Sequence, residues 1–309
     1  MKIHQFIERF FWVFLLAGLV LGLTSPAFSE FLMGMLGPLI MTMMFVVFLK
    51  SNLVHVLREI KNYKLMLYLV GAYMILIPVL LFFAVNIFDK KLAVGILLLT
   101  AMPAAVASTA LTDILKGNTA LSTSITIVTS IAAPFTIPIL FGLLNFDKFS
   151  IDTGEIFKDL AIIVFVPMLF SQIVRKYFPN AVRRNKNILT PINIFILSTM
   201  VYTVIGSQSE SLLQLSEDIV IQLAIVYLIF ILLHLAGYLL AYKQNRKNKI
   251  SITIGAAYMN NGLAIVLAAK YFDAYVLLLM VLSELPWNTL LAPFRKIMSL
   301  VNVNEVEKE

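Results

Sequence analysis

The sequence predicts an all-α membrane protein whose ten transmembrane helices form two inverted repeats of five helices. Three observations support this fold class. Hydrophobic residues make up 60% of the 309-residue chain and charged residues only 13%, whereas a soluble domain is about half apolar and a quarter charged. Apolar windows of about 20 residues recur along the chain. The positive charges gather in alternate connections, as they do in multi-span membrane proteins.

The apolar windows define ten candidate spans with short polar connections between them. They lie near residues 10–25, 31–49, 65–88, 92–115, 119–144, 160–174, 188–206, 219–242, 250–269 and 274–294. The sixth window is short and contains Pro167, but its amphipathic neighbours can complete a span. The main connections are the polar stretches 145–159, 175–186 and 207–218.

The first window has an alternative interpretation as a cleaved signal peptide. Lys2 and Arg9 precede an apolar run of 14 residues, and the segment 24–29 resembles a small-residue cleavage region. Cleavage would leave nine helices and an unpaired repeat. We therefore favour a retained span.

Charge distribution predicts the orientation. If the amino terminus is cytoplasmic, 19 of the 24 lysines and arginines lie in cytoplasmic segments. The other five are Lys90, Lys91, Lys148, Lys158 and Lys270. This bias predicts a multi-pass protein of the cell membrane with both termini in the cytoplasm. It also explains the net charge of +7, with anionic membrane lipid rather than nucleic acid as the counter-charge.

The two halves of the chain share a pattern of prolines and polar breaks. The fifth and tenth spans carry two prolines each, the second and seventh carry one each, and the fourth and ninth carry polar interruptions. An odd number of spans per half makes the second half inverted. We expect one transporter unit over residues 1–309, with repeats at 1–145 and 159–298.

The first polar break is the segment 102–109, with Pro103 followed by small residues. Proline removes a backbone donor, so this stretch is expected to unwind through Ser108 and Thr109 and to offer carbonyls and hydroxyls. Ser122, Thr126 and Thr129 share one stripe of the next span. These oxygens suit a small cation, although small hydroxyl residues also allow close helix packing.

The second polar break is the segment 258–264, in which Asn260, Asn261 and Gly262 are expected to interrupt a helix that resumes at Leu263. The amides can cap the freed ends, and the amino terminus of the resuming half-helix attracts negative charge. This favours an anionic or strongly polar substrate. The alternative is that the asparagines pair across helices as packing contacts.

These segments together resemble the bile acid:sodium symporter family. The resemblance is carried by the segment 97–138, with its Pro-x-x-x-Ala-Ser core and Lys116-Gly117-Asn118 turn, by Asn260-x-Gly262-Leu263-Ala264, and by the end of the first span at 22–26. It implies a core of spans three to five and eight to ten, at about 65–145 and 219–298, around two crossing broken helices. It also implies a panel at about 10–50 and 159–206.

The resemblance further implies alternating-access transport of a small organic anion by sodium symport. The positions that match the family's first sodium site are Ser108, Thr109, Ser122, Thr126 and Gly255. Thr109 stands where relatives usually have asparagine, and Gly255 stands where they have glutamate. At the second site, Tyr73 and Met259 stand where relatives have glutamine. A proton-coupled or uncoupled transporter is therefore the alternative.

Other polar residues in the spans are candidates for the site. Asp113 and Glu284 are acids that can bind sodium or carry a proton, and Asp113 can instead pair with Lys116. Asn288 matches an asparagine near the family's substrate cavity. His234 is a proton relay or a hydrogen-bonded structural histidine.

Several functional classes are disfavoured by the sequence. Metalloid-extruding relatives depend on a cysteine in the fourth span, and this chain has no cysteine. A hydrolase needs a nucleophile with a base in reach, and no such motif or nucleotide loop appears. A receptor is expected to carry a sizeable soluble or signalling segment, and the sequence shows none. We expect no enzymatic activity and no cofactor other than sodium or a proton as coupling ion.

Overall fold

A computed structural model of the chain describes residues 6–7, 10–50, 63–144, 152–214 and 216–306. Cations Lys2, Arg9, Arg58, Lys61, Lys148 and Lys308, which enter the charge argument above, lie outside the described residues. Within the described ranges the chain is helical, apart from turns and one isolated β-bridge that joins Ala104 to Met259.

The first half of the chain contains the following helices. They are α2 (Phe11–Thr24), α3 (Ser29–Met33), α4 (Leu36–Lys50), the continuous run of α6 (Tyr63–Gly71), a π-helical turn (Ala72–Leu76) and α7 (Ile77–Asn86), then α8 (Lys90–Thr100), α9 (Ser108–Ile114) and α10 (Thr119–Leu143).

The second half of the chain contains the following helices. They are α11 (Thr153–Tyr177), α12 (Pro179–Arg184), α13 (Lys186–Ser207), α14 (Ser209–Leu213), α15 (Glu217–Leu240), α16 (Arg246–Ala257), α17 (Asn261–Tyr271), α18 (Ala274–Thr289) and α19 (Leu291–Val306).

Six described segments are long and apolar enough to cross a membrane as single helices: 63–86, 119–143, 153–177, 186–207, 217–240 and 274–299. A seventh candidate is the pair 13–24 and 26–33, which bends by 88°. α4 is apolar but shorter. The predicted fourth and ninth spans are not among these segments, because each is broken into two helices that are too short to cross a membrane alone. The sixth predicted span is longer than expected, since α11 continues through Pro167 without a break.

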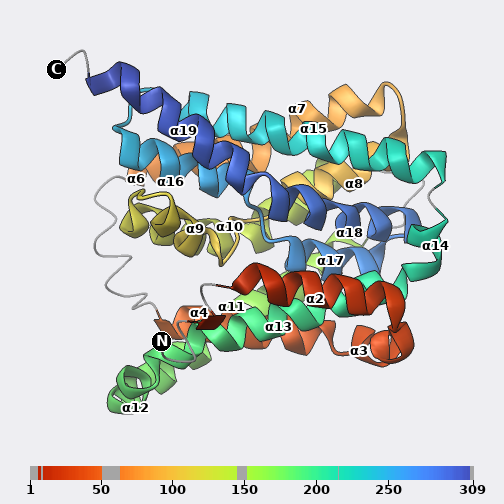
Figure 1. The fold of residues 1–309 in the computed structure, drawn as a ribbon, viewed down its shortest axis with the longest axis horizontal. Helices are drawn as coiled ribbons and strands as arrows, with labels where there is room; N and C mark the ends of the chain where they lie inside the picture. Colours follow the sequence, from red (N-terminus) through yellow and green to blue (C-terminus); the bar gives the residue numbers. More distant parts are fainter. Residues whose placement is uncertain (1–5, 8–9, 51–62, 145–151, 215, 307–309) are drawn as a thin grey trace.

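Two groups of helices pack among themselves. α2, α4, α11 and α13 form one layer, and α13 runs against both α2 and α4. Gly18 and Gly22 on α2 allow close approach, because a Cβ at Gly18 would lie 2.5 Å from the carbonyl oxygen of Ser198. The remaining long helices gather above this layer in Figure 1, with α16 against α15 and α10.

The two ends of the bundle differ in their connections. α12 projects at one end, near the start of α13, and α3 and α14 lie at the opposite end (Figure 1). The hydroxyl of Tyr202 near the end of α13 donates to the carbonyl of Ser25 at 2.9 Å, which ties this second end together. The cation-rich connection between α11 and α13 thus lies at the end away from α3.

Candidate functional site

The two polar breaks cross and bond to each other through their backbones. The amide of Ala105 donates to the carbonyl of Tyr258 at 2.7 Å, and the amide of Asn260 donates to the carbonyl of Pro103 at 2.8 Å. These two bonds make the antiparallel bridge between Ala104 and Met259. Each break therefore satisfies backbone groups of the other, which is how non-helical backbone can be kept away from water.

Both breaks are shorter than the sequence predicted. α8 ends at Thr100 and α9 begins at Ser108, so Ser108 and Thr109 lie in the first turn of the resumed helix rather than in the break. α17 likewise begins at Asn261, not at Leu263. Side-chain capping explains the second correction, because Oδ1 of Asn260 accepts from the amide of Leu263 at 3.1 Å and starts the helix early.

Two of the three predicted hydroxyls of α10 contact the first break, and the third contacts α9. Thr129 accepts a hydrogen bond from the amide of Ala104 at 3.1 Å. Thr126 donates to the carbonyl of Ala105 at 3.4 Å, and Ser122 accepts from the hydroxyl of Thr112 at 3.1 Å. All three side chains are buried. The stripe therefore supports the backbone of the break, whether or not an ion also lies there.

The other predicted ion-site hydroxyls divide between the crossing and the nearby cavity. Ser108 is fully buried and donates to the carbonyl of Tyr258 at 3.3 Å. Thr109 lines the cavity and shares a 3.3 Å hydrogen bond with Thr123. The carbonyl of Tyr258 accepts from the hydroxyl of Ser108, and the carbonyl of Ala105 accepts from the hydroxyl of Thr126, so oxygens concentrate at the crossing.

The turn between α9 and α10 is fixed by its three residues. Lys116 has a left-handed backbone with φ of 59°. A Cβ at Gly117 would lie 2.7 Å from Thr112 and 2.8 Å from Ile250. Asn118 caps α10 by accepting from the amide of Leu121 at 3.1 Å. The turn thereby delivers the hydroxyl stripe directly opposite the first break.

A cavity of about 690 Å³ lies beside the crossing. Its lining comes from both breaks, from α9 and α10, from α18, and from α2, α4 and α13 of the opposite layer. Its polar lining includes Lys50, Asp113, Lys186, Asn193 and Glu284, together with the predicted substrate residues Asn260, Asn261 and Gly262. The volume is in the range of small-molecule sites.

The two asparagines of the second break keep unused polar atoms. Nδ2 of Asn260 and Oδ1 of Asn261 are buried and have no partner among the described residues. Nδ2 of Asn261 donates to the hydroxyl of Ser283 at 3.0 Å, which fixes its side chain against α18. A buried amide atom without a partner costs free energy, so a polar ligand beside these residues would recover part of that cost.

The two predicted acids lie in different environments. Glu284 is 6% exposed and lines the cavity from α18. Asn288 does not line the cavity. Its side-chain Nδ2 donates to the carbonyl of Glu284 at 2.7 Å and lies 3.4 Å from Oε2 of the Glu284 carboxylate. Asp113 is exposed on the cavity wall, and in the described residues it forms no ion pair with Lys116. Their contact is the bond from the amide of Lys116 to the carbonyl of Asp113.

The position of Gly255 is closed by side chains. A Cβ there would lie 3.0 Å from Cγ2 of Ile125 and 3.7 Å from the ring of Tyr73. The hydroxyl of Tyr73 donates to the carbonyl of Ile252 at 2.7 Å, so the ring is held against α16. Space that would accommodate an acidic side chain on α16 is therefore filled by an aliphatic and an aromatic group.

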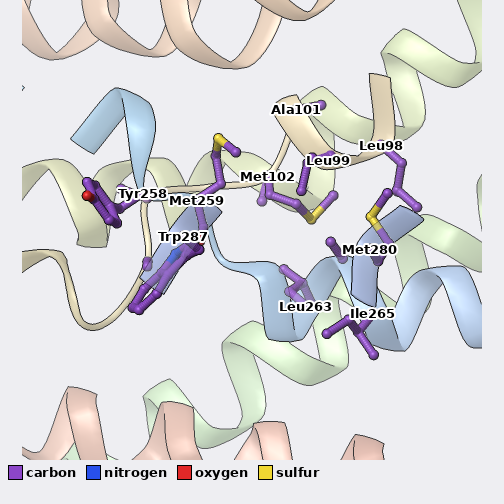
Figure 2. Packing of buried hydrophobic residues seen from close by; sticks show 14 of the residues in the cluster. Leu98, Leu99, Ala101, Met102, Tyr258, Met259, Leu263, Ile265, Met280 and Trp287 are labelled. Carbon is purple, nitrogen blue, oxygen red and sulfur yellow. The ribbon is translucent and has the colours of Figure 1, made fainter. Parts of the chain in front are cut away.

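An aromatic cluster at the second break was not predicted from the sequence. Nε1 of Trp287 donates to the carbonyl of Met259 at 3.2 Å, and its ring lies 5.5 Å from that of Tyr258. Figure 2 shows Tyr258, Met259 and Trp287 gathered at the break. His234 packs edge-on to Tyr258 at 5.3 Å, while its Nδ1 bonds the carbonyl of Phe230 at 2.7 Å. The sequence signal for this cluster was Trp287, which follows Pro286 on α18 and stands one helical turn after Ser283.

Comparison with known proteins matches nearly the whole chain to one family. A family model described as the SBF-like CPA transporter family covers residues 8–290. A Bacillus subtilis protein named uncharacterized sodium-dependent transporter YocS is 27% identical over 189 residues, which are 59% of this chain and 57% of the relative.

Plant relatives show a similar level of identity. The Arabidopsis thaliana probable sodium/metabolite cotransporter BASS1, chloroplastic, is 25% identical over 186 residues, 58% of this chain and 45% of the relative. The rice probable sodium/metabolite cotransporter BASS2, chloroplastic, is 27% identical over 190 residues, 60% of this chain and 44% of the relative. The chain thus spans about half the length of the curated relatives it matches.

Proposed function

The chain belongs to the SBF-like CPA transporter family, and from this premise we propose that it moves a small organic anion across the cell membrane by alternating access. Its family and relatives are transporters rather than enzymes, and its apolar helices make it a multi-pass membrane protein. The observation that carries the proposal is the cavity at the crossing of the two breaks, where buried amide atoms of Asn260 and Asn261 have no partner in the part of the chain that the structure describes.

Charges of both signs line this cavity, with Asp113 and Glu284 as its acids, and its cationic groups offer positions for the anionic group of a substrate. Lys50 and Lys186 line it from α4 and α13, and the amino terminus of α17 borders it from the other side. A helix amino terminus and two ammonium groups favour negative charge. Apolar groups such as Met43, Leu197 and Trp287 line the rest, which suits the hydrocarbon part of an organic anion. A carboxylate on an apolar body is the chemical class that fits both.

Sodium is the first candidate for the coupling ion. The bacterial and plant relatives carry sodium in their names. Ser108, Ser122, Thr126 and the carbonyls of the crossing supply neutral oxygens within one buried region, which is the donor type that small hard cations take. A sodium ion bound there would stabilise the crossing and hence the substrate cavity.

Proton coupling is the second candidate, and Glu284 favours it. Gly255 supplies no acid at its position on α16, and side chains close the space there, whereas Glu284 is a buried carboxyl on the cavity wall. A buried carboxylate without a cationic partner is costly, so a proton or a cation is expected to accompany it during transport.

The topology proposed is ten spans in two inverted repeats with both termini in the cytoplasm. Each half contains one broken helix, α8–α9 and α16–α17, and the two breaks meet. Cysteine-accessibility labelling tests the orientation, because the chain has no native cysteine. A cysteine in α12 should react with a membrane-impermeant maleimide only in inverted vesicles. Labelling of intact cells would contradict the orientation.

Uptake into proteoliposomes tests the function and separates the coupling ions. We would measure the accumulation of labelled monocarboxylates, from acetate to cholate, under two conditions. The first is an inward sodium gradient with the same pH on both sides, and the second is an inward proton gradient with potassium in place of sodium. Accumulation under sodium alone supports symport with sodium, and accumulation under the proton gradient alone supports proton coupling. Uptake of a carboxylate to equilibrium, at a rate that neither gradient changes, supports uncoupled transport. Failure of all carboxylates to enter would contradict an organic anion as substrate.

A further inference from the structure

A second cavity, of about 640 Å³, lies where α4, α11, α12 and α13 meet. We propose that this cavity binds the phosphate group of an anionic phospholipid. Four of its lining cations, Arg175, Lys176, Arg183 and Lys186, come from the end of α11, from α12 and from the start of α13. α12 is the short helix that projects from this end of the bundle in Figure 1.

Among the residues that the structure describes, no aspartate or glutamate lines this cavity. No aspartate or glutamate occurs in the sequence from Leu160 to Ser209, and none occurs in α4. The described ion pairs are Lys91 with Asp273 and Lys270 with Asp159, both away from this cavity. Several like charges held together without a counter-ion are destabilising. An external anion would therefore gain favourable energy by entering.

Backbone acceptors near the cavity are already used. Nε2 of Gln172 donates to the carbonyl of Phe48 at 3.1 Å, and Nη1 of Arg175 donates to the carbonyl of Leu49 at 3.0 Å. These bonds cap the end of α4 and fix α11 against it. Arg183 and Lys186 make no such bond among the described contacts, so their donors remain available for an anion. Phosphate accepts several charge-assisted hydrogen bonds of this kind.

The apolar part of the cavity distinguishes a lipid from a soluble anion. Leu49, Val182 and Leu189 pack together at its base. Beside it, Ile173 and Phe178 expose 52% and 62% of their surface on the outer side of α11 and its end. Cations next to apolar and aromatic side chains at a helix end match the headgroup level of a bilayer. A phospholipid would set its phosphate among the cations and its chains along the exposed face of α11.

The lipid would also stand next to the transport cavity. Lys186 lines both this cavity and the cavity at the crossing of the two breaks. A phosphate bound here would therefore also affect the electrostatic potential in the cavity at the crossing. A free phosphate or a soluble carboxylate could use the same cations, and the experiment must therefore compare lipid with soluble phosphate. The apolar base favours the lipid because a soluble phosphate gains nothing from it.

The test is lipid binding by the purified 309-residue chain in detergent, followed by native mass spectrometry and thermal unfolding. The probes are phosphatidylglycerol, phosphatidylcholine with the same chains, and inorganic phosphate. The variant K176Q/R183Q removes two cavity cations. The matched control R184Q/K243Q removes two cations that do not line the cavity, so both proteins lose the same charge.

We expect phosphatidylglycerol to bind and to raise the midpoint of unfolding more than phosphatidylcholine, since a ligand of the folded state stabilises it by mass action. K176Q/R183Q should weaken phosphatidylglycerol binding by about tenfold or more, because each surface cation contributes noticeably to attraction for anionic lipid. The control should bind as the unmodified protein does. Equal binding of both lipids, or equal loss in both double variants, would overturn the proposal, as would a stabilisation that inorganic phosphate alone reproduces in full.

Discussion

The hydroxyl of Thr129 in the middle of α10 accepts a hydrogen bond from the backbone amide of Ala104 in the first break, at 3.1 Å. The same hydroxyl donates to the carbonyl of Ile125 at 2.7 Å. Both residues are buried. A single threonine thus satisfies the amide of Ala104, which lies between the two backbone bonds of the bridge to Met259.

Replacing Thr129 by valine should destabilise the protein while leaving its shape nearly unchanged. The amide of Ala104 would lose its acceptor in an apolar environment, which costs about 1–3 kcal/mol. Thr136→Val is the matched control, because the hydroxyl of Thr136 bonds only the carbonyl of Ala132 in its own helix. Thermal unfolding in detergent measures both. Equal midpoints for the two variants would mean that the Thr129 contact does not hold the break.

Asn260→Asp should separate helix capping from substrate binding. Aspartate keeps the oxygen that accepts from the amide of Leu263, so the cap is retained. Its carboxylate would be buried without a cationic partner among the described residues, which should lower the midpoint of thermal unfolding, and affinity is therefore compared at equal amounts of folded protein. The substitution removes the unpartnered Nδ2 and adds a negative charge to the cavity wall. Affinity for an anionic substrate should fall by about tenfold or more, since a hydrogen bond to a charged group is worth about 1.5–3 kcal/mol.

Asn245→Asp provides the control for this experiment. Asn245 caps α16 by accepting from the amide of Asn248 at 3.0 Å and does not line the cavity. It should leave both stability and transport unchanged. If Asn260→Asp transports its carboxylate with unchanged KM, the second break does not contact the substrate.

The positions of the helices and of both breaks could be predicted because they depend on local chemistry. Apolar length marks the long helices, Pro103 marks the first break, and Asn260 marks the second. The stripe of Ser122, Thr126 and Thr129 follows from helical periodicity, and its contacts with the break and with α9 agree with the prediction that this face lies against the first broken helix. The exact ends of the breaks could not be predicted, because they depend on bonds between two segments about 150 residues apart.

The contacts between distant helices were also beyond sequence reasoning. The bond from Trp287 to Met259 and the packing of Ile125 and Tyr73 around Gly255 join residues that no local pattern relates. Asn288 was expected beside the substrate from resemblance, yet it turns back onto Glu284 in its own helix. A residue's type and helix can be read locally, but the direction of its side chain depends on the neighbouring helices.

Gly255→Ala should destabilise the core because the added methyl would meet Cγ2 of Ile125 at 3.0 Å. Overpacking of this kind costs about 1–3 kcal/mol. Gly71→Ala is the control: Gly71 is helical with φ of −60°, and a Cβ there meets nothing within 4 Å. That variant should be neutral or stabilised by up to about 1 kcal/mol, since alanine favours the helix. Midpoints of thermal unfolding that do not separate the two variants would contradict the close packing at Gly255.

Glu284→Gln should remove the ion dependence of transport and keep the protein folded. Glutamine retains the oxygen near Nδ2 of Asn288 but cannot ionise, so a carboxyl that exchanges a proton or holds a sodium ion loses that ability. Stability should be unchanged or higher, because burying an unpaired carboxylate is costly. Proteoliposome uptake should then be insensitive to whichever gradient drives the unmodified protein. Asp113→Asn tests the other acid of the same cavity, which is exposed and therefore pays little for its charge. It should keep its ion dependence, whereas loss of that dependence in Asp113→Asn and its retention in Glu284→Gln would assign the coupling to Asp113 instead.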